Sequence, residues 1–264
     1  MAAERMSSLP FSPVRPKRRT SDKLIFISCE GSVTEWEYFE KIINMVFANI
    51  GSKVKIINVL EEALKKRDKN RTSDEKKQVS SSKPQNLLDK MNDFKSAHKD
   101  DYDFDEHEQD EFWLIMDVDD HTDQTIVDSE GKSNLDKWNA VLNECHNNKY
   151  QYAVSNPFFE LWLLLHFDDV NEEDYGYAVK DSHSYESTSH FRERLTALKV
   201  PLKEDKHFDA RYYSKYSKEA INSAILRAEC LDSEHKCDYP VDLGSTVYRL
   251  LKSIKEIDDQ YEGN

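Results

Sequence analysis

Acidic side chains follow three apolar runs of the sequence, close to the point where each run ends. Glu30 follows KLIFISC, Asp117 and Asp119 follow EFWLIM, and Glu160 comes soon after YQYAVS. Residues two apart on an extended chain share a face, so an extended backbone through Val118 would point Asp117 and Asp119 the same way. Carboxylate oxygens suit Mg²⁺ or Mn²⁺ better than Zn²⁺. A cation held by Glu30, Asp117 and Asp119 would act on phosphate esters by stabilising charge and activating water.

Three further polar residues near these positions are candidates for the same chemistry. Glu160 interrupts an apolar helical segment, and because burial without a partner is costly, it either faces the metal edge or reaches solvent. His121 follows the two aspartates in a loop and is a candidate for proton transfer or for a phosphate contact. Asn156 precedes Pro157 and either caps the next helix or contacts the substrate.

The apolar runs predict the strands that would position these residues. The runs at 23–29, 54–60, 111–116 and 150–155 are short and rich in β-branched and aromatic residues, which is typical of buried strands. Helical spacing separates them, and this alternation indicates an α/β fold with a central, mostly parallel sheet flanked by helices. The carboxyl ends of parallel strands lie at one edge, so the acidic residues are expected to gather there.

Helical spacing continues to the end of the sequence and predicts a largely helical C-terminal part. The expected helices in order are 34–47, 84–97, 134–147, 158–167, 188–199, 212–231 and 245–257. Thr34 is the expected cap of the first of them. We expect residues 23–264 to form one domain.

Composition and charge exclude several classes of protein. With 37 Lys and Arg against 51 Asp and Glu, the formal net charge is −14. The sequence has no GxxxxGK[ST] pattern, so it supplies no ATP hydrolysis by that route. No run approaches the length of a membrane span, and the N-terminus lacks the apolar region of a secretory signal. The four cysteines form no CxxC pair, which favours reduced thiols in a cytoplasmic protein.

Residues 1–22 contain prolines, serines and a basic cluster, which predicts a flexible arm. The cluster consists of Arg15, Lys17, Arg18 and Arg19. It is either a solvated tail or a contact for the phosphate backbone of a nucleic acid.

Three segments resemble the RloB-like family, and the resemblance covers most of residues 15–255. They are FISCEGSVTEWEYF (26–39), SNPFFELWLLLHF (155–167) and GSTVYRLL (244–251). Phe158 stands where that family often has Cys, which is a difference in packing and not in a ligand. A Glu after the first strand and a DxD after a later one also resemble the Toprim domain of topoisomerases, primases and OLD-family nucleases.

The resemblance implies a Toprim-like fold, a role in bacterial antiphage defence and a partner ATPase of the AAA or ABC type. It implies that Glu35 carries a second ion, although Glu35 is equally suited to the first turn of a helix. It also allows Glu30 to act as a general base while Asp117 and Asp119 hold the metal. Lys203 and Lys206 are candidates for the cation that such nucleases place near the scissile phosphate.

The expected function is a Mg²⁺- or Mn²⁺-dependent nuclease, with RNA, including tRNA, favoured over DNA, that acts as a toxic effector. Two alternatives stay open. The same carboxylates would serve a nucleotidyl or phosphoryl transferase, and an acidic edge would also suit a non-catalytic subunit of an ATPase complex. We expect no membrane partner, and a homo-oligomer stays open.

Overall fold

The computed structural model describes residues 23–31, 33–47, 50, 54–55, 83–102, 104, 109–178, 186–232 and 238–262. The basic arm with Arg15, Lys17, Arg18 and Arg19 lies outside these residues, and so does the expected strand beyond residue 55. The sheet, both helical layers and every other candidate residue named above lie within them.

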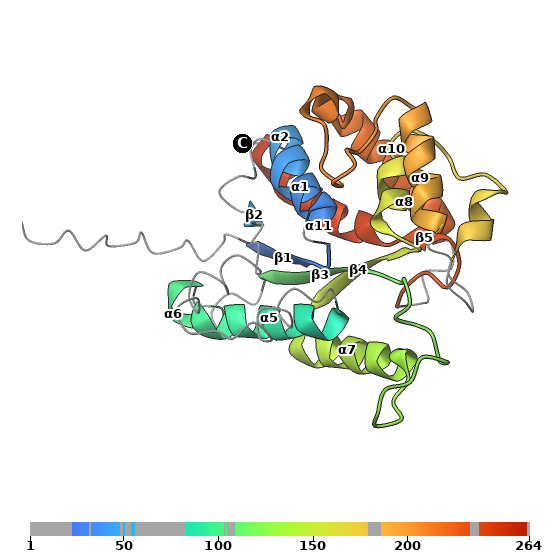
Figure 1. The fold of residues 1–264 in the computed structure, drawn as a ribbon. Helices are drawn as coiled ribbons and strands as arrows, with labels where there is room; N and C mark the ends of the chain where they lie inside the picture. Colours follow the sequence, from blue (N-terminus) through green and yellow to red (C-terminus); the bar gives the residue numbers. More distant parts are fainter. Residues whose placement is uncertain are drawn as a thin grey trace, which may run out of the picture.

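A five-stranded sheet with the order β2-β1-β3-β4-β5 forms the centre of the fold (Figure 1). The strands β1 (Ile25–Cys29), β2 (Val54–Lys55), β3 (Glu111–Asp117) and β4 (Gln151–Asn156) are parallel. The short β5 (Gly244–Ser245), which the sequence did not indicate, runs antiparallel to β4. The expected α/β fold with a mostly parallel sheet is confirmed.

Alternating side chains of the strands divide the interior into two apolar clusters, one on each face of the sheet. Ile25, Ile27 and Ile115 belong to the upper cluster in the view of Figure 1. Phe26 and Leu114 belong to the lower cluster. Both faces of each central strand are therefore buried, as expected for parallel strands covered by helices on both sides.

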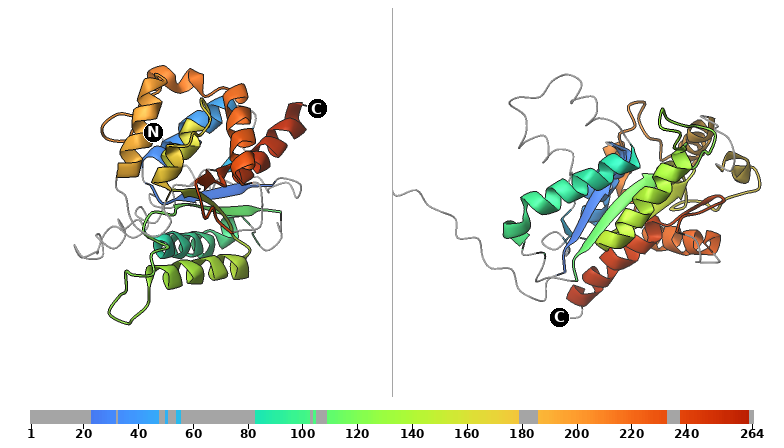
Figure 2. Two further views of the ribbon diagram at one scale, coloured as in Figure 1. Left: turned by 90° about the vertical axis from the view of Figure 1, so that its right-hand side faces the viewer. Right: turned by 90° about the horizontal axis from the view of Figure 1, so that it is seen from below.

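The lower layer consists of α5 (Pro84–Ala97), α6 (Lys99–Tyr102) and α7 (Asn134–Asn148). Helices α5 and α7 lie side by side under the sheet (Figure 2). Pro84 occupies the first turn of α5, where its missing N–H costs nothing. Ser133 and Asp136 form a capping box at the start of α7, which fixes where that helix begins.

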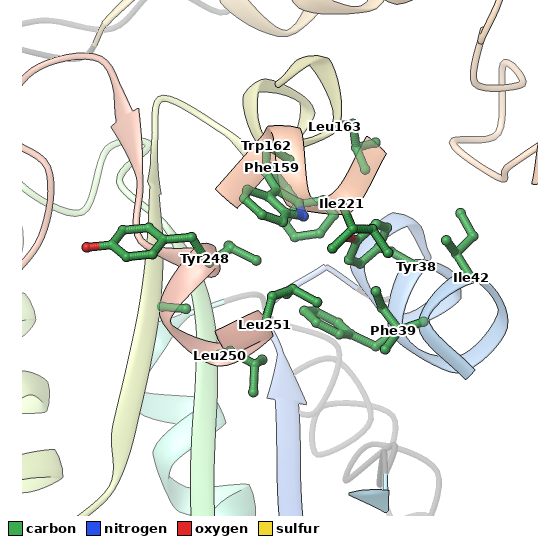
Figure 3. Close-up of a cluster of buried hydrophobic side chains, with 14 of the residues drawn as sticks. Tyr38, Phe39, Ile42, Phe159, Trp162, Leu163, Ile221, Tyr248, Leu250 and Leu251 are labelled. Atoms are coloured by element: carbon green, nitrogen blue, oxygen red, sulfur yellow. The ribbon is translucent and has the colours of Figure 1, made fainter. Parts of the chain in front are cut away.

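The upper layer collects the rest of the helices. It contains α1 (Thr34–Glu37), the π-helical η1 (Tyr38–Ile43) and α2 (Asn44–Val46), which follow one another without a break. The C-terminal part adds α8 (Phe159–Leu164), the short η3 (Asp174–Tyr177), α9 (Glu186–Ala197), η4 (Ala210–Lys215), α10 (Lys218–Leu231) and α11 (Val247–Glu262). Aromatic and aliphatic side chains from these elements interlock in the cluster drawn in Figure 3.

Two expectations about the helices were wrong in detail. The helical spacing over 212–231 does not form one helix, because η4 ends at Lys215 and Ser217 caps α10 by accepting from the backbone amide of Ala220. Thr34 does not cap α1, because its hydroxyl donates to the carbonyl oxygen of Lys206 at 3.0 Å. This bond ties the start of α1 to a loop more than 170 residues further along the chain.

Among the residues that the structure describes, no helix has the length and apolar character needed to cross a membrane.

Candidate active site

Carboxylates from three consecutive strand ends gather at the carboxyl edge of the sheet. Glu30 directly follows β1, Asp117 is the last residue of β3, and Glu160 lies in the first turn of α8 after β4. The backbone amide of Glu30 donates to the carbonyl oxygen of Ile115 at 2.9 Å, so the pairing of the two strands continues up to the site. The backbone amide of Asp117 donates to Oε2 of Glu30 at 3.2 Å.

Glu35 joins this group because α1 folds back over the turn after β1. A Cβ added at Gly31 would overlap the carboxylate of Glu35, so only glycine leaves room for that carboxylate. The sequence EGSVTE therefore places two glutamates, Glu30 and Glu35, at the same strand end.

The electrostatics of the cluster (Glu30, Glu35, Asp117 and Glu160) are those of crowded carboxylates, of which Glu35 and Glu160 are buried and Glu30 and Asp117 are partly buried. Burial, followed by the charges of Glu35, Glu30 and Glu160, raises the pKa of Asp117 well above its ordinary value. Burial, with repulsion from Glu160 and Glu30, raises the pKa of Glu35 to about 7. Burial also raises the pKa values of Glu30 and Glu160. The four carboxylates are thus close enough to disfavour one another's ionisation.

The cluster fits the chemistry of a hard divalent cation. Its ligand atoms are all carboxylate oxygens, which Mg²⁺ and Mn²⁺ prefer. Oδ1 of Asp117 is buried and has no hydrogen-bond partner, which leaves an acceptor for a cation. Within the described residues, however, no three acidic, histidine or cysteine side chains are arranged as a ready ligand set for one ion. The cluster therefore offers suitable oxygen ligands for a divalent cation, but these oxygens are not already arranged around one ion.

Asp119 does not share a face with Asp117. The argument for a shared face required an extended backbone through Val118, but β3 ends at Asp117 and Asp119 has a φ of 34°. The backbone at Asp119 is therefore left-handed and not extended, and the premise of a shared face was wrong. The charge of Asp119 acts on Glu30 and His121. Its role as a metal ligand stays a prediction.

His121 lies at the site and pairs with Glu30. Its Nε2 is 2.8 Å from Oε1 of Glu30, and its ring stacks nearly parallel to that of Trp138. Burial alone would lower the pKa of His121, but the hydrogen bond to Glu30 and the nearby charges of Glu30, Asp120 and Asp119 raise it overall. Glu30 and His121 form a hydrogen-bonded acid–base pair beside the other carboxylates.

A loop before η4 brings Lys206 to the cluster. Oε2 of Glu37 accepts from the backbone amide of Phe208 at 2.8 Å, and Oε1 of Glu37 accepts from Nδ1 of His207 at 2.8 Å. These bonds, with the Thr34 bond, hold the loop against α1. The charge of Lys206 lowers the pKa values of Glu35 and Glu160, while the charge of Lys203 acts on Asp209. Of the two candidate lysines, the structure brings Lys206 to the carboxylates.

Arg192 is a member of the site that the sequence did not reveal. Its Nε is 3.3 Å from Oε1 of Glu160, and its charge lowers the pKa of that glutamate. In the sequence Arg192 is one charged residue of an amphipathic helix, and no spacing relates it to Glu160. Sequence patterns relate residues that are neighbours within one helix or strand. No pattern in the sequence therefore indicates this contact between α9 and α8.

Asn156 has a structural role at the end of β4. It is 1% exposed, and its Nδ2 donates to the carbonyl oxygens of Pro240 and Val241 at 3.1 and 3.2 Å. It does not cap α8, which begins two residues after the cis Asn156–Pro157 bond with Phe158 as its N-cap residue. The capping interpretation was therefore wrong, because the chain turns before the helix starts. Asn156 fastens the segment before β5 to the end of β4.

Comparison with known proteins identifies one family. A family model described as RloB-like protein matches residues 25–254, which is most of the chain and includes each member of the carboxylate cluster. No significant match was found among curated proteins or among solved structures.

Proposed function

Since the chain belongs to the RloB-like family, we propose that it is a divalent-cation-dependent nuclease that hydrolyses phosphodiester bonds, with RNA as the favoured substrate. The observation that carries the proposal is the cluster of the buried Glu35 and Glu160 with the partly buried Glu30 and Asp117, in which one oxygen of Asp117 has no hydrogen-bond partner. Four crowded carboxylates that are largely shielded from solvent repel one another, and a cation between them would remove that repulsion. The sheet order is consistent with a Toprim-like arrangement.

Asp117, Glu35 and Glu160 are the residues that would hold the cation. A bound Mg²⁺ or Mn²⁺ supplies charge stabilisation at the phosphate and a lower pKa for water. Glu30 and His121 are hydrogen-bonded to each other, so either can take the proton that the attacking water loses. The water oxygen forms a bond to phosphorus, the bond from phosphorus to the leaving oxygen breaks, and that oxygen receives a proton.

Lys206 is the candidate that neutralises charge on the phosphate. It reaches the cluster from the loop held by Glu37 and Thr34, and a lysine there is a point charge without a required orientation. We further propose that the chain serves as the toxic effector of an antiphage defence system. Because it lacks a Walker A pattern, any ATP hydrolysis in that system belongs to a partner ATPase.

The test is cleavage of labelled tRNA, messenger RNA and plasmid DNA, each with Mg²⁺, with Mn²⁺ and with EDTA. We expect cation-dependent cleavage of RNA that is lost in Asp117→Asn. A matched control is Asp89→Asn, because Asp89 is an exposed aspartate of α5 on the other side of the sheet. Cleavage that persists in Asp117→Asn would refute the proposed site. Nucleotide transfer without hydrolysis would favour the transferase, and ATPase binding without either activity would favour the interaction subunit.

A further inference from the structure

The guanidinium of Arg192 has a buried edge without hydrogen-bond partners. Its Nε and Nη2 atoms are both buried, and neither makes a hydrogen bond. Oε1 of Glu160 lies 3.3 Å from Nε, but this contact lacks hydrogen-bond geometry. Buried donors without acceptors are costly and uncommon, so this edge calls for an explanation.

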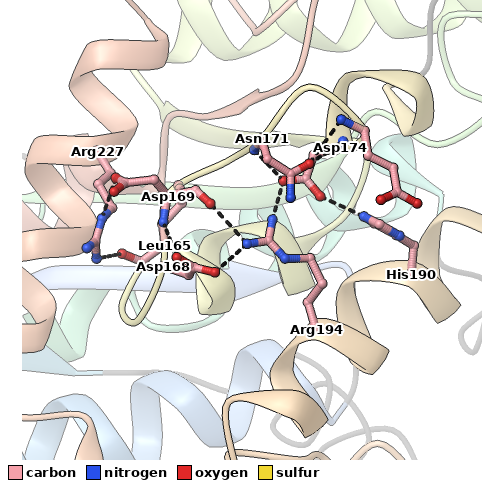
Figure 4. Close-up of polar contacts among 9 residues, drawn as sticks. Leu165, Asp168, Asp169, Asn171, Asp174, His190, Arg194 and Arg227 are labelled. Carbon is pink, nitrogen blue, oxygen red and sulfur yellow. Dashed lines mark hydrogen bonds and ion pairs between the residues drawn. The ribbon is translucent and has the colours of Figure 1, made fainter.

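The helix that carries Arg192 is held from two other sides. Phe191 and Leu195 are fully buried in the upper apolar cluster. On another side, Asp174 binds both His190 and Arg194, and Arg194 also pairs with Asp168 (Figure 4). Because α9 is fastened in this way, the position of Arg192 beside Glu160 follows from the fold and does not depend on the weak contact between them.

The unpartnered edge has the shape of an anion receptor. Nε–H and Nη2–H project in parallel from one side of the guanidinium and match two oxygens of a carboxylate or a phosphate. Arg211 shows the filled form of this edge on the surface, with its Nε and Nη2 bound to the carboxylate of Asp209. At Arg192 the carboxylate of Glu160 lies nearby without filling the edge.

We propose that the Nε–Nη2 edge of Arg192 binds two non-bridging oxygens of a phosphodiester. This inference rests on the proposed function, because it takes the carboxylate cluster as the place where the cation binds. Without a cation, Glu160 partly covers the edge and competes with the phosphate without excluding it, and it would leave the edge on turning to a cation. The bound phosphate would then lie next to the carboxylate cluster that would hold the cation. The side chain of Arg192 is 25% exposed although Nε and Nη2 are buried, so the residue borders solvent and the phosphate reaches the edge when Glu160 moves aside.

The experiment measures the binding of fluorescein-labelled RNA and DNA oligonucleotides by anisotropy in EDTA, where no cation supports cleavage. Arg192→Lys keeps the charge and removes the two-pronged edge, and we expect the affinity for both probes to fall about tenfold, as for the loss of a charge-assisted hydrogen bond. Arg211→Lys is the matched control and is expected to bind as the wild type does. Equal losses for RNA and DNA indicate recognition of the phosphodiester, whereas a loss for RNA alone would overturn that assignment.

A second pair of variants tests whether Glu160 covers the edge. Glu160→Gln and Glu35→Gln each remove one negative charge from the same cluster, but the ion pair of Arg192 is with Glu160. We expect Glu160→Gln to tighten binding at least about threefold more than Glu35→Gln, since only Glu160→Gln also frees the edge. These variants decide the question if Arg192→Lys does not fold.

The inference is overturned if Arg192→Lys binds both probes as the wild type does, or if it melts at a lower temperature with unchanged affinity. Either result would leave Arg192 as a structural partner of Glu160. Failure of the proposed function is a separate outcome, because it appears as the absence of cation-dependent cleavage in the wild type, whereas the anisotropy measurement requires no turnover.

Discussion

Asp117 and Asp174 are both aspartates with buried carboxylate oxygens, yet their surroundings differ. Asp174 is 0% exposed, and its oxygens accept hydrogen bonds from the backbone amide of Asn171 at 2.7 Å, from His190 at 2.6 Å and from Arg194. Asp117 has one oxygen without a partner and lies among Glu35, Glu30 and Glu160. One aspartate is surrounded by donors, and the other by further carboxylates.

We interpret this difference as that between a structural carboxylate and a carboxylate of the proposed cation site. A buried charge is stable when donors and opposite charges satisfy it, and the network around Asp174 provides both. This network joins the segment after α8 to α9 and so holds Arg192 in place. At the sheet edge, His121, Arg192 and Lys206 offset only part of the repulsion, since the pKa values of Glu30, Glu35 and Glu160 stay raised, so we expect protons or a bound cation to supply the rest.

The largest expected effect is the loss of cleavage in Asp117→Asn. Removal of one cation ligand should lower the single-turnover rate at least about a hundredfold, because the cation contributes several kcal/mol to the transition state. The free energy of unfolding should stay the same or rise, since one repelling charge is gone. Rapid-quench kinetics and urea unfolding measure the two quantities. Loss of activity together with a large loss of stability would contradict the comparison.

Asp174→Asn should show the reverse pattern. Removing the charge leaves Arg194 and His190 facing a neutral amide, so the free energy of unfolding should fall by about 3 kcal/mol. Urea unfolding measures this loss, with Asp89→Asn as the control. The Mn²⁺ affinity of the protein that remains folded should be unchanged, and a parallel loss of Mn²⁺ affinity would mean that the two regions are not separable.

The crowded cluster should make stability depend on pH. The pKa of Glu35 is raised from 4.5 to about 7, so the folded protein holds this proton more tightly than the unfolded chain does. Stability therefore falls as the pH rises from about 4.5 through about 7. Glu35→Gln should raise the melting temperature at pH 8 by about 5 °C and flatten this dependence.

Thermal melts between pH 5 and pH 8 test this expectation, and Mn²⁺ should restore stability to the wild type at the high end of that range. A wild-type melting temperature that rises from pH 5 to pH 8 would contradict the assignment of the raised pKa.

The smallest expected effect distinguishes the two lysines. Lys206→Ala should lower the cleavage rate about tenfold, in line with the loss of one charge contact to the phosphate. Lys203→Ala is the matched control from the same loop and should retain the wild-type rate. Equal rates for the two variants would remove Lys206 from the site.

The central strands were predictable because a buried strand shows in the sequence as a run of adjacent apolar residues. The runs before Glu30 and Asp117 are continuous apolar segments, and the structure confirms that β1 and β3 pair directly. The two-residue β5 was not predictable, because its pairing depends on Ser155 and Asn156 of β4 and not on its own residues. Helical periodicity likewise ran through Tyr216, although Ser217 starts a new helix there.

The site was predictable only in part. Glu30 and Asp117 were identified because each lies at the end of an apolar run that is recognisable as a strand. Asp119 was grouped with Asp117 on the assumption of an extended backbone. The backbone instead turns at Asp119, and a two-residue spacing in the sequence does not reveal such a turn.

The sequence by itself determined the α/β fold, the parallel sheet and the strand ends at which acidic residues gather, because apolar runs and their polar stops are local features. The sequence offered Glu35, Glu160 and Lys206 as candidates, but only the tertiary structure decided that they and Arg192 meet at that edge. These four residues come from different elements, and the packing of α1, α8, α9 and the loop before η4 brings them together. Which charges become neighbours depends on how helices pack across the sheet, and residue spacing along the chain carries no record of that packing.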